Sequence, residues 1–370
     1  MPILFLHEVI IILGLFLAFL WQPHSLYYGD SCTNLLIVNA VSKYGTLDLH
    51  EVRHLCAGSA AGQFSLGARG EWYSVHEIVW PILATPFYMV FGDFGVLVFN
   101  ILGMLFIARS AYLILLTFCS DFAARLAVVV VFLTPPVVTA PLNFGSDWPG
   151  VVILMAVFRV LLRQRYFLSG LIGGAVLLVR IHGVLAFPAF AVFLVMNIGR
   201  LSGLGRAMCL LFMGMLPGIL AFAVQNHLLY DDLFTFSYQR RLENEYDGSS
   251  LVRHTALLTM PDLSRVYKLT FDSNLGLFSG QIYFLPVWIV GIWLMCKAKL
   301  FKYVAMILTS FFTYIGFYAC YPDLVGPVRY FSFIVVLGAL PLGIFLQSII
   351  PRALAKSLMI QEKPHSVWLR

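Results

Sequence analysis

The chain begins with the apolar stretch PILFLHEVIIILGLFLAFLW at residues 2–21, and the short polar stretch YGDSCTN follows at residues 28–34. About 20 mostly apolar residues are enough to cross a bilayer as a helix. The first stretch lacks the basic leading region and the small-residue cleavage site of a signal peptide, so we predict that it is a membrane span. The carboxylate of Asp30 is then placed just beyond the end of this span.

The composition extends this prediction to the whole chain. Hydrophobic residues make up 60% of the 370 residues and charged residues only 11%, whereas about a quarter of an average soluble domain is charged. We therefore predict an all-α polytopic membrane protein. Apolar windows place about ten spans, at roughly 3–21, 93–118, 122–141, 148–163, 167–179, 183–198, 207–229, 280–296, 303–320 and 330–350.

The basic residues predict the orientation of these spans. With the N-terminus in the cytoplasm, the cytoplasmic turns and span ends hold fourteen of the 24 Lys and Arg residues, as the positive-inside rule requires. They are Arg109, Arg125, Arg159, Arg163, Arg165, Arg200, Arg206, Lys297, Lys299, Lys302, Arg352, Lys356, Lys363 and Arg370. The net charge of +6 therefore indicates topology and not a nucleic-acid-binding surface.

This topology divides the chain into a transmembrane domain, residues 1–350, and a short cytoplasmic tail, residues 351–370. Its two long outer loops are residues 22–92 and 230–279. Functional residues lie more often in such long loops than in the short turns that join the spans on the cytoplasmic side. We therefore expect the functional face outside the cytoplasm.

The first outer loop contains three recognisable segments. Apolar residues recur at helical spacing in 30–49, which predicts a short amphipathic helix lying in the membrane interface. Residues 57–70 are small and predict a flexible segment, and the proline-broken stretch 78–91 fits a buried or interfacial helix. Cys32 and Cys56 both lie in this loop, and sequence leaves open whether they form a disulfide.

Two carboxylates are candidate catalytic groups, and each has a plainer alternative. Asp30 and Asp147 both stand where a helix is expected to begin, so each can act simply as a helix cap, worth about 1 kcal/mol. A carboxylate on the outer face can instead act as a general base toward an acceptor hydroxyl. Capping is the stronger alternative for Asp147, because Pro149 adds a further helix-start signal.

Candidate phosphate-binding residues lie in two further stretches. Arg180 and His182 separate two short apolar segments, and Arg329 with Tyr330 stands at the mouth of the last span. An arginine at such a position can reach to the interface as an anchor, or it can bind a phosphate. The sequence contains no P-loop, no dinucleotide fingerprint, no nucleophile elbow and no metal-binding His/Cys spacing. We therefore expect no cofactor.

The order of these motifs resembles the GT-C superfamily of integral-membrane glycosyltransferases, near the dolichyl-phosphate-mannose and aminoarabinose transferase branch. That branch places an acidic residue after the first span, followed by an interfacial helix. The matching stretches are YYGDSCTNLLIVNAVSKYGTLDL (27–49), YSVHEIVWPILATPFYMVFG (73–92), Asp147 before a span, LGLFSGQIYFLP (275–286) and GPVRYF (326–331). The sequence differs in having Glu77 and Ile78 where a glycine usually follows the histidine, and an extra Val328 in the last motif.

The resemblance implies transfer of a sugar from a polyprenyl-phosphate-linked donor to a hydroxyl of a lipid, glycan or protein acceptor, with inversion. It implies that Asp30 is the base and that Arg329, helped by Arg180 or His76, stabilises the departing phosphate. It also implies a multi-pass protein of a bacterial inner membrane, with both termini cytoplasmic and the site on the periplasmic side.

Two other functions fit the composition. A lipid or solute transporter or flippase would explain many spans with buried charge, although no inverted repeat is visible. A non-catalytic subunit of a membrane assembly would explain the departures from the family motifs.

Overall fold

The structure is a computed structural model of the 370-residue chain. It describes residues 6–21, 29–56, 64–75, 77–138, 140–145, 147–199, 201–233, 260, 262–271, 277, 284–320 and 332–350. In chain order the elements are α1 (Leu6–Trp21), α2 (Gly29–Tyr44), η2 (Arg53–Cys56), β1 (Phe64–Leu66), β2 (Trp72–Ser74), α3 (Val79–Phe91), α4 (Asp93–Leu115), α5 (Asp121–Phe132), α6 (Pro135–Val138), η3 (Ala140–Leu142), α7 (Asp147–Leu162), α8 (Tyr166–Val179), η4 (Ile181–Ala186), α9 (Phe187–Ile198), α10 (Leu201–Tyr230), α11 (Leu263–Phe271), α12 (Phe284–Lys297), α13 (Phe301–Ala319), α14 (Ser332–Leu337) and α15 (Ala339–Ile349). The predicted all-α class is confirmed.

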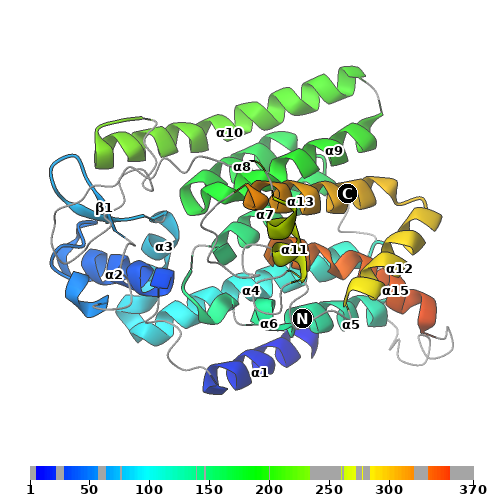
Figure 1. The fold of residues 1–370 in the computed structure, drawn as a ribbon, viewed down its shortest axis with the longest axis horizontal. Helices are drawn as coiled ribbons and strands as arrows, with labels where there is room; N and C mark the ends of the chain where they lie inside the picture. The colour runs from blue at the N-terminus through cyan, green and yellow to red at the C-terminus, as the bar shows by residue number, and fades with distance from the viewer. Residues whose placement is uncertain are drawn as a thin grey trace.

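Long apolar helices dominate the described part of the chain. Three are long and apolar enough to span a membrane: Asp93–Leu115, Ile181–Ile198 and Gly203–Tyr230. Six shorter apolar helices accompany them: Leu6–Ala18, Val79–Phe91, Trp148–Leu162, Tyr166–Val179, Phe284–Lys297 and Phe333–Ile349. Figure 1 shows that α10, α9 and α13 run in similar directions, with α2, α3 and the hairpin gathered at one end. We call this the α2 end of the molecule.

Each expected span contains a helix, but the span expected at 122–141 is broken. α5 ends at Phe132, and only the short α6 and η3 follow it. Thr134 precedes two consecutive prolines, Pro135 and Pro136. A proline lacks the backbone donor that a helix needs, and it disfavours helical geometry in the residue before it. The helix therefore stops short of the expected length.

The helix α2 is present as predicted, but its surroundings are not those of an amphipathic helix with one exposed face. Every residue from 31 to 40 is buried. The buried set includes the polar side chains of Ser31, Thr33, Asn34 and Asn39. The helix therefore lies inside the protein, covered by α3 on one side and by η2 and β2 on others, and the expectation of an exposed polar face is wrong.

A small hairpin occurs where the sequence suggested only a flexible segment. Strands β1 and β2 pair antiparallel, with Ser65 opposite Tyr73. The hairpin is attached to the end of α10, because the hydroxyls of Ser65 and Tyr230 lie 2.9 Å apart and Ala68 N–H donates to the carbonyl of Leu229 at 3.1 Å. Burial raises the pKa of the Tyr73 phenol, and nearby Glu71 adds to this effect.

One cysteine of the α2 end is held in a disulfide. Cys32 is buried and disulfide-bonded, whereas Cys119, Cys209, Cys296 and Cys320 are free. The side chain of Cys56 lies outside the described part, although its backbone ends η2, which packs on α2. A bridge from Cys32 to Cys56 therefore stays a prediction.

Helices α8 and α10 cross through glycines. A Cβ at Gly214 would lie 2.1 Å from the Phe167 carbonyl oxygen, and a Cβ at Gly218 would lie 2.3 Å from the backbone of Gly174. Small residues four apart allow backbones to approach this closely in membrane helices. The far side of α10 exposes a row of apolar side chains at four-residue spacing: Met208, Phe212, Leu216, Leu220, Val224 and Leu228.

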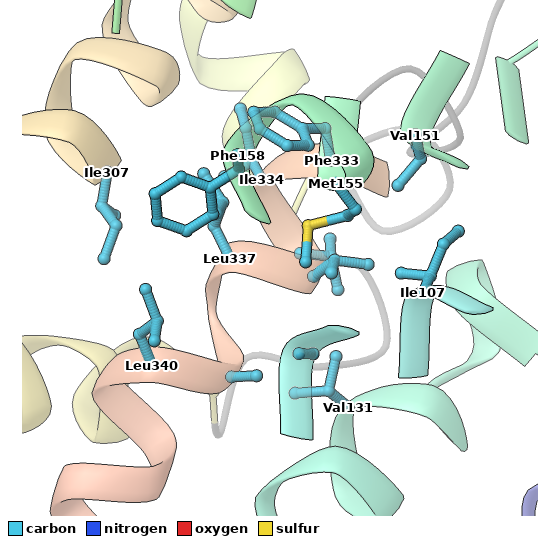
Figure 2. Packing of buried hydrophobic residues seen from close by; sticks show 14 of the residues in the cluster. Ile107, Val131, Val151, Met155, Phe158, Ile307, Phe333, Ile334, Leu337 and Leu340 are labelled. Atoms are coloured by element: carbon cyan, nitrogen blue, oxygen red, sulfur yellow. The ribbon is translucent and has the colours of Figure 1, made fainter. Parts of the chain in front are cut away.

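The main core is built around the last helices of the chain. Figure 2 shows Phe333, Ile334, Leu337 and Leu340, from α14 and α15, surrounded by buried side chains of α4, α5, α7 and α13. These residues are at most 5% exposed. The helix α14 and the first turns of α15 therefore lie in the main core, whereas the last turns of α15 are more exposed.

Candidate functional site

Four segments that are distant in sequence meet at the α2 end. They are the first turns of α2, residues 77–80, residues 140–145 with 147–150, and residues 180–183. Buried side chains from these segments and their neighbours form a single apolar cluster, whose members are Leu35, Val38, Trp80, Ala84, Val96, Leu97, Phe144 and Val179. Each of the four segments contains the start of a helix, so backbone groups that a helix leaves without partners come together here.

A buried carboxylate links two of the segments. Glu77 is 8% exposed, and its Oε1 accepts a hydrogen bond from the backbone N–H of Ile181 at 2.8 Å. Ile181 is the first residue of η4, and Arg180 connects η4 to α8. Glu77 therefore holds the turn that carries Arg180.

Arg180 is itself enclosed at this junction. Its side chain is 4% exposed, and its backbone is extended between two helices. The first turn of α7 lies against it, because a Cβ added at Gly150 would be 3.1 Å from Arg180 Cβ. The absence of a side chain at Gly150 thus makes room for the arginine. A buried, permanently charged guanidinium is the residue type best suited to bind a phosphate.

Amide side chains tie the remaining segments together. Asn34 Nδ2 donates to the carbonyl of Phe144 at 2.6 Å, which joins α2 to the loop before α7. Asn100 accepts from Trp80 Nε1 at 3.1 Å and donates to the carbonyl of Pro141 at 3.1 Å. Asn100 thereby joins α3, α4 and η3. The loop that precedes Asp147 is held from two sides.

This region also contains buried polar atoms that have no hydrogen-bond partner among the described residues. They are Thr33 Oγ1, Asn34 Oδ1 and Glu77 Oε2, and also Trp148 Nε1, whose residue lies in the first turn of α7 and packs in the main core. Such an atom costs about 1–3 kcal/mol when it is left unsatisfied. Elsewhere in the described part, buried atoms in the side chains of His7, Ser110 and Ser310 also make no hydrogen bond to described residues, so such atoms are not confined to the α2 end. We call the four atoms on Thr33, Asn34, Glu77 and Trp148 the open atoms. They include both donors and acceptors of hydrogen bonds.

The structure describes only some of the predicted site residues. Asp30 is in the first turn of α2, and Asp147 is the first residue of α7, as expected, but their side chains lie outside the described part. His76, Arg329 and Tyr330 also lie outside the described residues. Arg180 is described and lies at this meeting point. His182, its neighbour, packs against Phe317 and Tyr318 at ring-centroid distances of 5.7 and 6.0 Å.

Sequence analysis did not select Glu77, Thr33, Asn34 or Trp148 as site residues. Glu77 carried one available signal, because an ionisable residue beside an apolar stretch in a membrane protein is a functional candidate. Thr33, Asn34 and Trp148 carried none, since Thr and Asn near helix starts are ordinary caps and a tryptophan in an apolar stretch is an ordinary core residue. Among the described residues, no group of three or more His, Cys, Asp or Glu side chains is placed to hold a metal ion.

The arrangement can bind a ligand that is rich in hydrogen-bonding groups and carries an anion. The open atoms offer two acceptors, a hydroxyl and an indole donor, and Arg180 offers positive charge close by. Comparisons with models of protein families, with curated proteins and with solved structures find no match to this chain.

Proposed function

We propose that the chain is a membrane glycosyltransferase that moves a sugar from a polyprenyl-phosphate-linked donor to an acceptor hydroxyl on the extracytoplasmic side, with inversion. The observation that carries this proposal is the buried Arg180 on the turn that Glu77 holds, together with open polar atoms on Thr33, Glu77 and Trp148, which lie on neighbouring segments. A sugar supplies hydroxyls for such atoms, and a lipid-linked phosphate supplies an anion for the arginine.

In the proposed reaction, the carboxylate of Asp30 takes the proton of the acceptor hydroxyl as the hydroxyl oxygen attacks the anomeric carbon. The bond between this carbon and the phosphate oxygen breaks, and the electron pair leaves with the polyprenyl phosphate. Arg180 and Arg329 stabilise the developing negative charge. His76 and Tyr330 assist in binding the phosphate, and Asp147 contributes a second carboxylate that binds the acceptor.

The placement of the helix starts supports these roles. The backbone of α2 begins with Gly29 and Asp30, and α7 begins with Asp147. The bond from Asn34 to Phe144 brings these two helix starts into the same part of the molecule. The proposal therefore needs no rearrangement of the described helices.

The test is a transfer assay with Asp30→Asn. The purified protein is placed in liposomes with polyprenyl-phosphate-linked mannose, glucose or aminoarabinose, each radiolabelled, and a membrane extract supplies acceptors. Asp231, which is 79% exposed at its side chain near the end of α10, provides the matched control Asp231→Asn. We expect transfer by the parent and by the control, and a loss of at least 100-fold in Asp30→Asn.

Three results would count against the proposal. Undiminished transfer by Asp30→Asn would remove Asp30 from the role of base. Ion-coupled uptake of a solute by the same liposomes, without transfer of any sugar, would favour a transporter. Absence of both activities from a folded parent protein would favour an assembly subunit.

A further inference from the structure

Two arginines on neighbouring helices lie at the same level, toward the helix ends opposite the α2 end. Helices α4 and α7 both begin near the α2 end and pack on each other. A Cβ added at Gly103 of α4 would lie 3.2 Å from Cγ2 of Val152 in α7. Arg109 follows Gly103 by six residues, and Arg159 follows Val152 by seven. Because a helix rises about 1.5 Å per residue, the two arginines reach nearly the same level.

A third arginine joins them from the turn after α7. Arg163 follows Arg159 by four residues, the spacing that places two side chains on one face of a helix. Its backbone N–H donates to the carbonyl of Val160 at 3.1 Å, so this turn continues the end of α7. The charges of Arg163 and Arg109 are both near enough to act on Arg159. The three guanidinium groups therefore form one cluster, which we call the arginine cluster.

The arginine cluster holds more positive charge than its described neighbours balance. Arg159 is partly buried within the apolar helix Trp148–Leu162. The side chains of Arg159 and Arg163 make no hydrogen bond and no ion pair with any residue that the structure describes. Arg109 lies 4.0 Å from Glu8, and this carboxylate can balance only one of the three charges.

Membrane topology alone does not explain this arrangement. Basic residues that set the orientation need only lie in exposed turns or at helix ends, as Arg165 and Arg206 do. Arg159 instead combines partial loss of hydration with repulsion by two neighbouring cations, and both effects are unfavourable. An anion bound between the three side chains would offset them.

We propose that Arg109, Arg159 and Arg163 form a binding site for a phosphate group, on the side of the membrane that the basic residues predict to be cytoplasmic. Guanidinium groups bind phosphate oxygens through pairs of hydrogen bonds, and a phosphate balances the charge that Glu8 leaves over. Its source is either the headgroup of an anionic lipid, as at other basic sites between membrane helices, or a soluble phosphate compound. The site does not depend on the proposed transfer reaction.

The test measures the melting temperature of the purified protein in detergent with two kinds of phosphate probe. Phosphatidic acid is the lipid probe, and diacylglycerol, which lacks the phosphate, is its control. Inorganic phosphate is the soluble probe, and chloride at the same ionic strength is its control. The test variants are Arg159→Gln and Arg163→Gln. Arg206→Gln is the matched control variant, because Arg206 is an exposed arginine of α10.

We expect at least one phosphate probe to raise the melting temperature of the parent and of Arg206→Gln above that with its own control compound. This shift should be lost in Arg159→Gln and in Arg163→Gln. A shift with phosphatidic acid alone would identify a lipid headgroup as the ligand, and a shift with inorganic phosphate would identify a soluble one. Arg163→Gln changes an exposed side chain, so the test stands even where Arg159→Gln does not fold.

Two results would overturn the proposal. The first is a parent protein that neither phosphate probe stabilises. The second is an equal shift in the parent, in Arg163→Gln and in Arg206→Gln, which would show that phosphate acts on the protein without the arginine cluster.

Discussion

Two polar clusters lie toward opposite ends of the helices, and they differ in whether their charged side chains form ion pairs with each other. In the cluster near the start of α5, Glu8 lies 4.0 Å from Arg109, and Asp121 Oδ2 accepts from Arg125 Nε at 2.8 Å. The Tyr112 hydroxyl donates to the other oxygen of Asp121. Each charge in this cluster has an opposite charge beside it. At the α2 end, by contrast, only one oxygen of Glu77 accepts a hydrogen bond from the described residues.

The difference separates a structural role from a functional one. Charges within a membrane domain are expensive unless they are paired, and the α5 cluster satisfies this requirement with its own residues. The α2 end retains buried groups that the described protein does not satisfy. Such groups need an explanation, for example a catalytic role or a bound water or ion, and we propose that a ligand completes those at the α2 end. The following predictions test this contrast, beginning with the largest expected effect.

The α2 end should depend on its disulfide. Cys32→Ser removes the bridge that Cys32 makes, and loss of a disulfide typically costs about 2–5 kcal/mol. We expect a clear drop in the apparent melting temperature of the purified protein, measured in detergent. Labelling the denatured, unreduced parent protein should find only the four thiols already seen to be free, and labelling of all six cysteines would contradict the bridge.

The next largest effect is expected at Glu77. Glu77→Ala leaves the backbone N–H of Ile181 without its acceptor, which should cost about 1–3 kcal/mol of stability and displace Arg180. Glu77→Gln keeps a carbonyl acceptor and should restore most of the stability. If the α2 end is a ligand site, ligand binding or transfer should stay impaired in Glu77→Gln. Full activity of both variants would remove Glu77 from the site.

A smaller effect is expected from the open donor of Trp148. Trp148→Phe removes Nε1, which has no partner among the described residues, while keeping an aromatic ring in the core. We expect little change in melting temperature and about a tenfold loss in transfer or in affinity for the ligand, as for one hydrogen bond of about 1.4 kcal/mol. Trp293→Phe is the matched control, since Trp293 is 53% exposed on α12. A large drop in melting temperature with unchanged activity would assign Trp148 a purely structural role.

The smallest effect is expected at the α5 cluster. Arg125 and Asp121 are partly exposed, with side-chain exposures of 22% and 39%, so the pair is worth no more than about 1 kcal/mol. Arg125→Gln should lower the melting temperature slightly and leave transfer unchanged. Loss of transfer in a protein of normal stability would show that the contrast between the two clusters is false.

The helix positions could be predicted from hydropathy, because a chain in lipid must satisfy its backbone within each helix. Three local features were predicted wrongly or missed, because hydropathy alone does not determine them. α5 stops at Phe132 because Pro135 and Pro136 follow, and the hairpin at Phe64–Leu66 was missed because a strand of three residues has too little periodicity to detect. The burial of α2 depends on packing partners that its own sequence does not contain.

The site was predictable only in part. The helix starts that carry Asp30 and Asp147, and the junction that carries Arg180, were expected from local sequence and are present. Glu77 could not be assigned a partner in this way, because its hydrogen bond reaches Ile181, far along the chain. The same holds for Asn34 and the carbonyl of Phe144. Long-range contacts of this kind require the folded chain.

The most direct test of the central claim is an experimental structure of the purified protein in lipid nanodiscs with added polyprenyl phosphate. The account predicts phosphate density beside Arg180 at the α2 end, with new contacts to the open atoms of Glu77 or Trp148 when the sugar-linked donor is used. Phosphate bound at another part of the protein, or an Arg180 closed off from bound lipid, would contradict it.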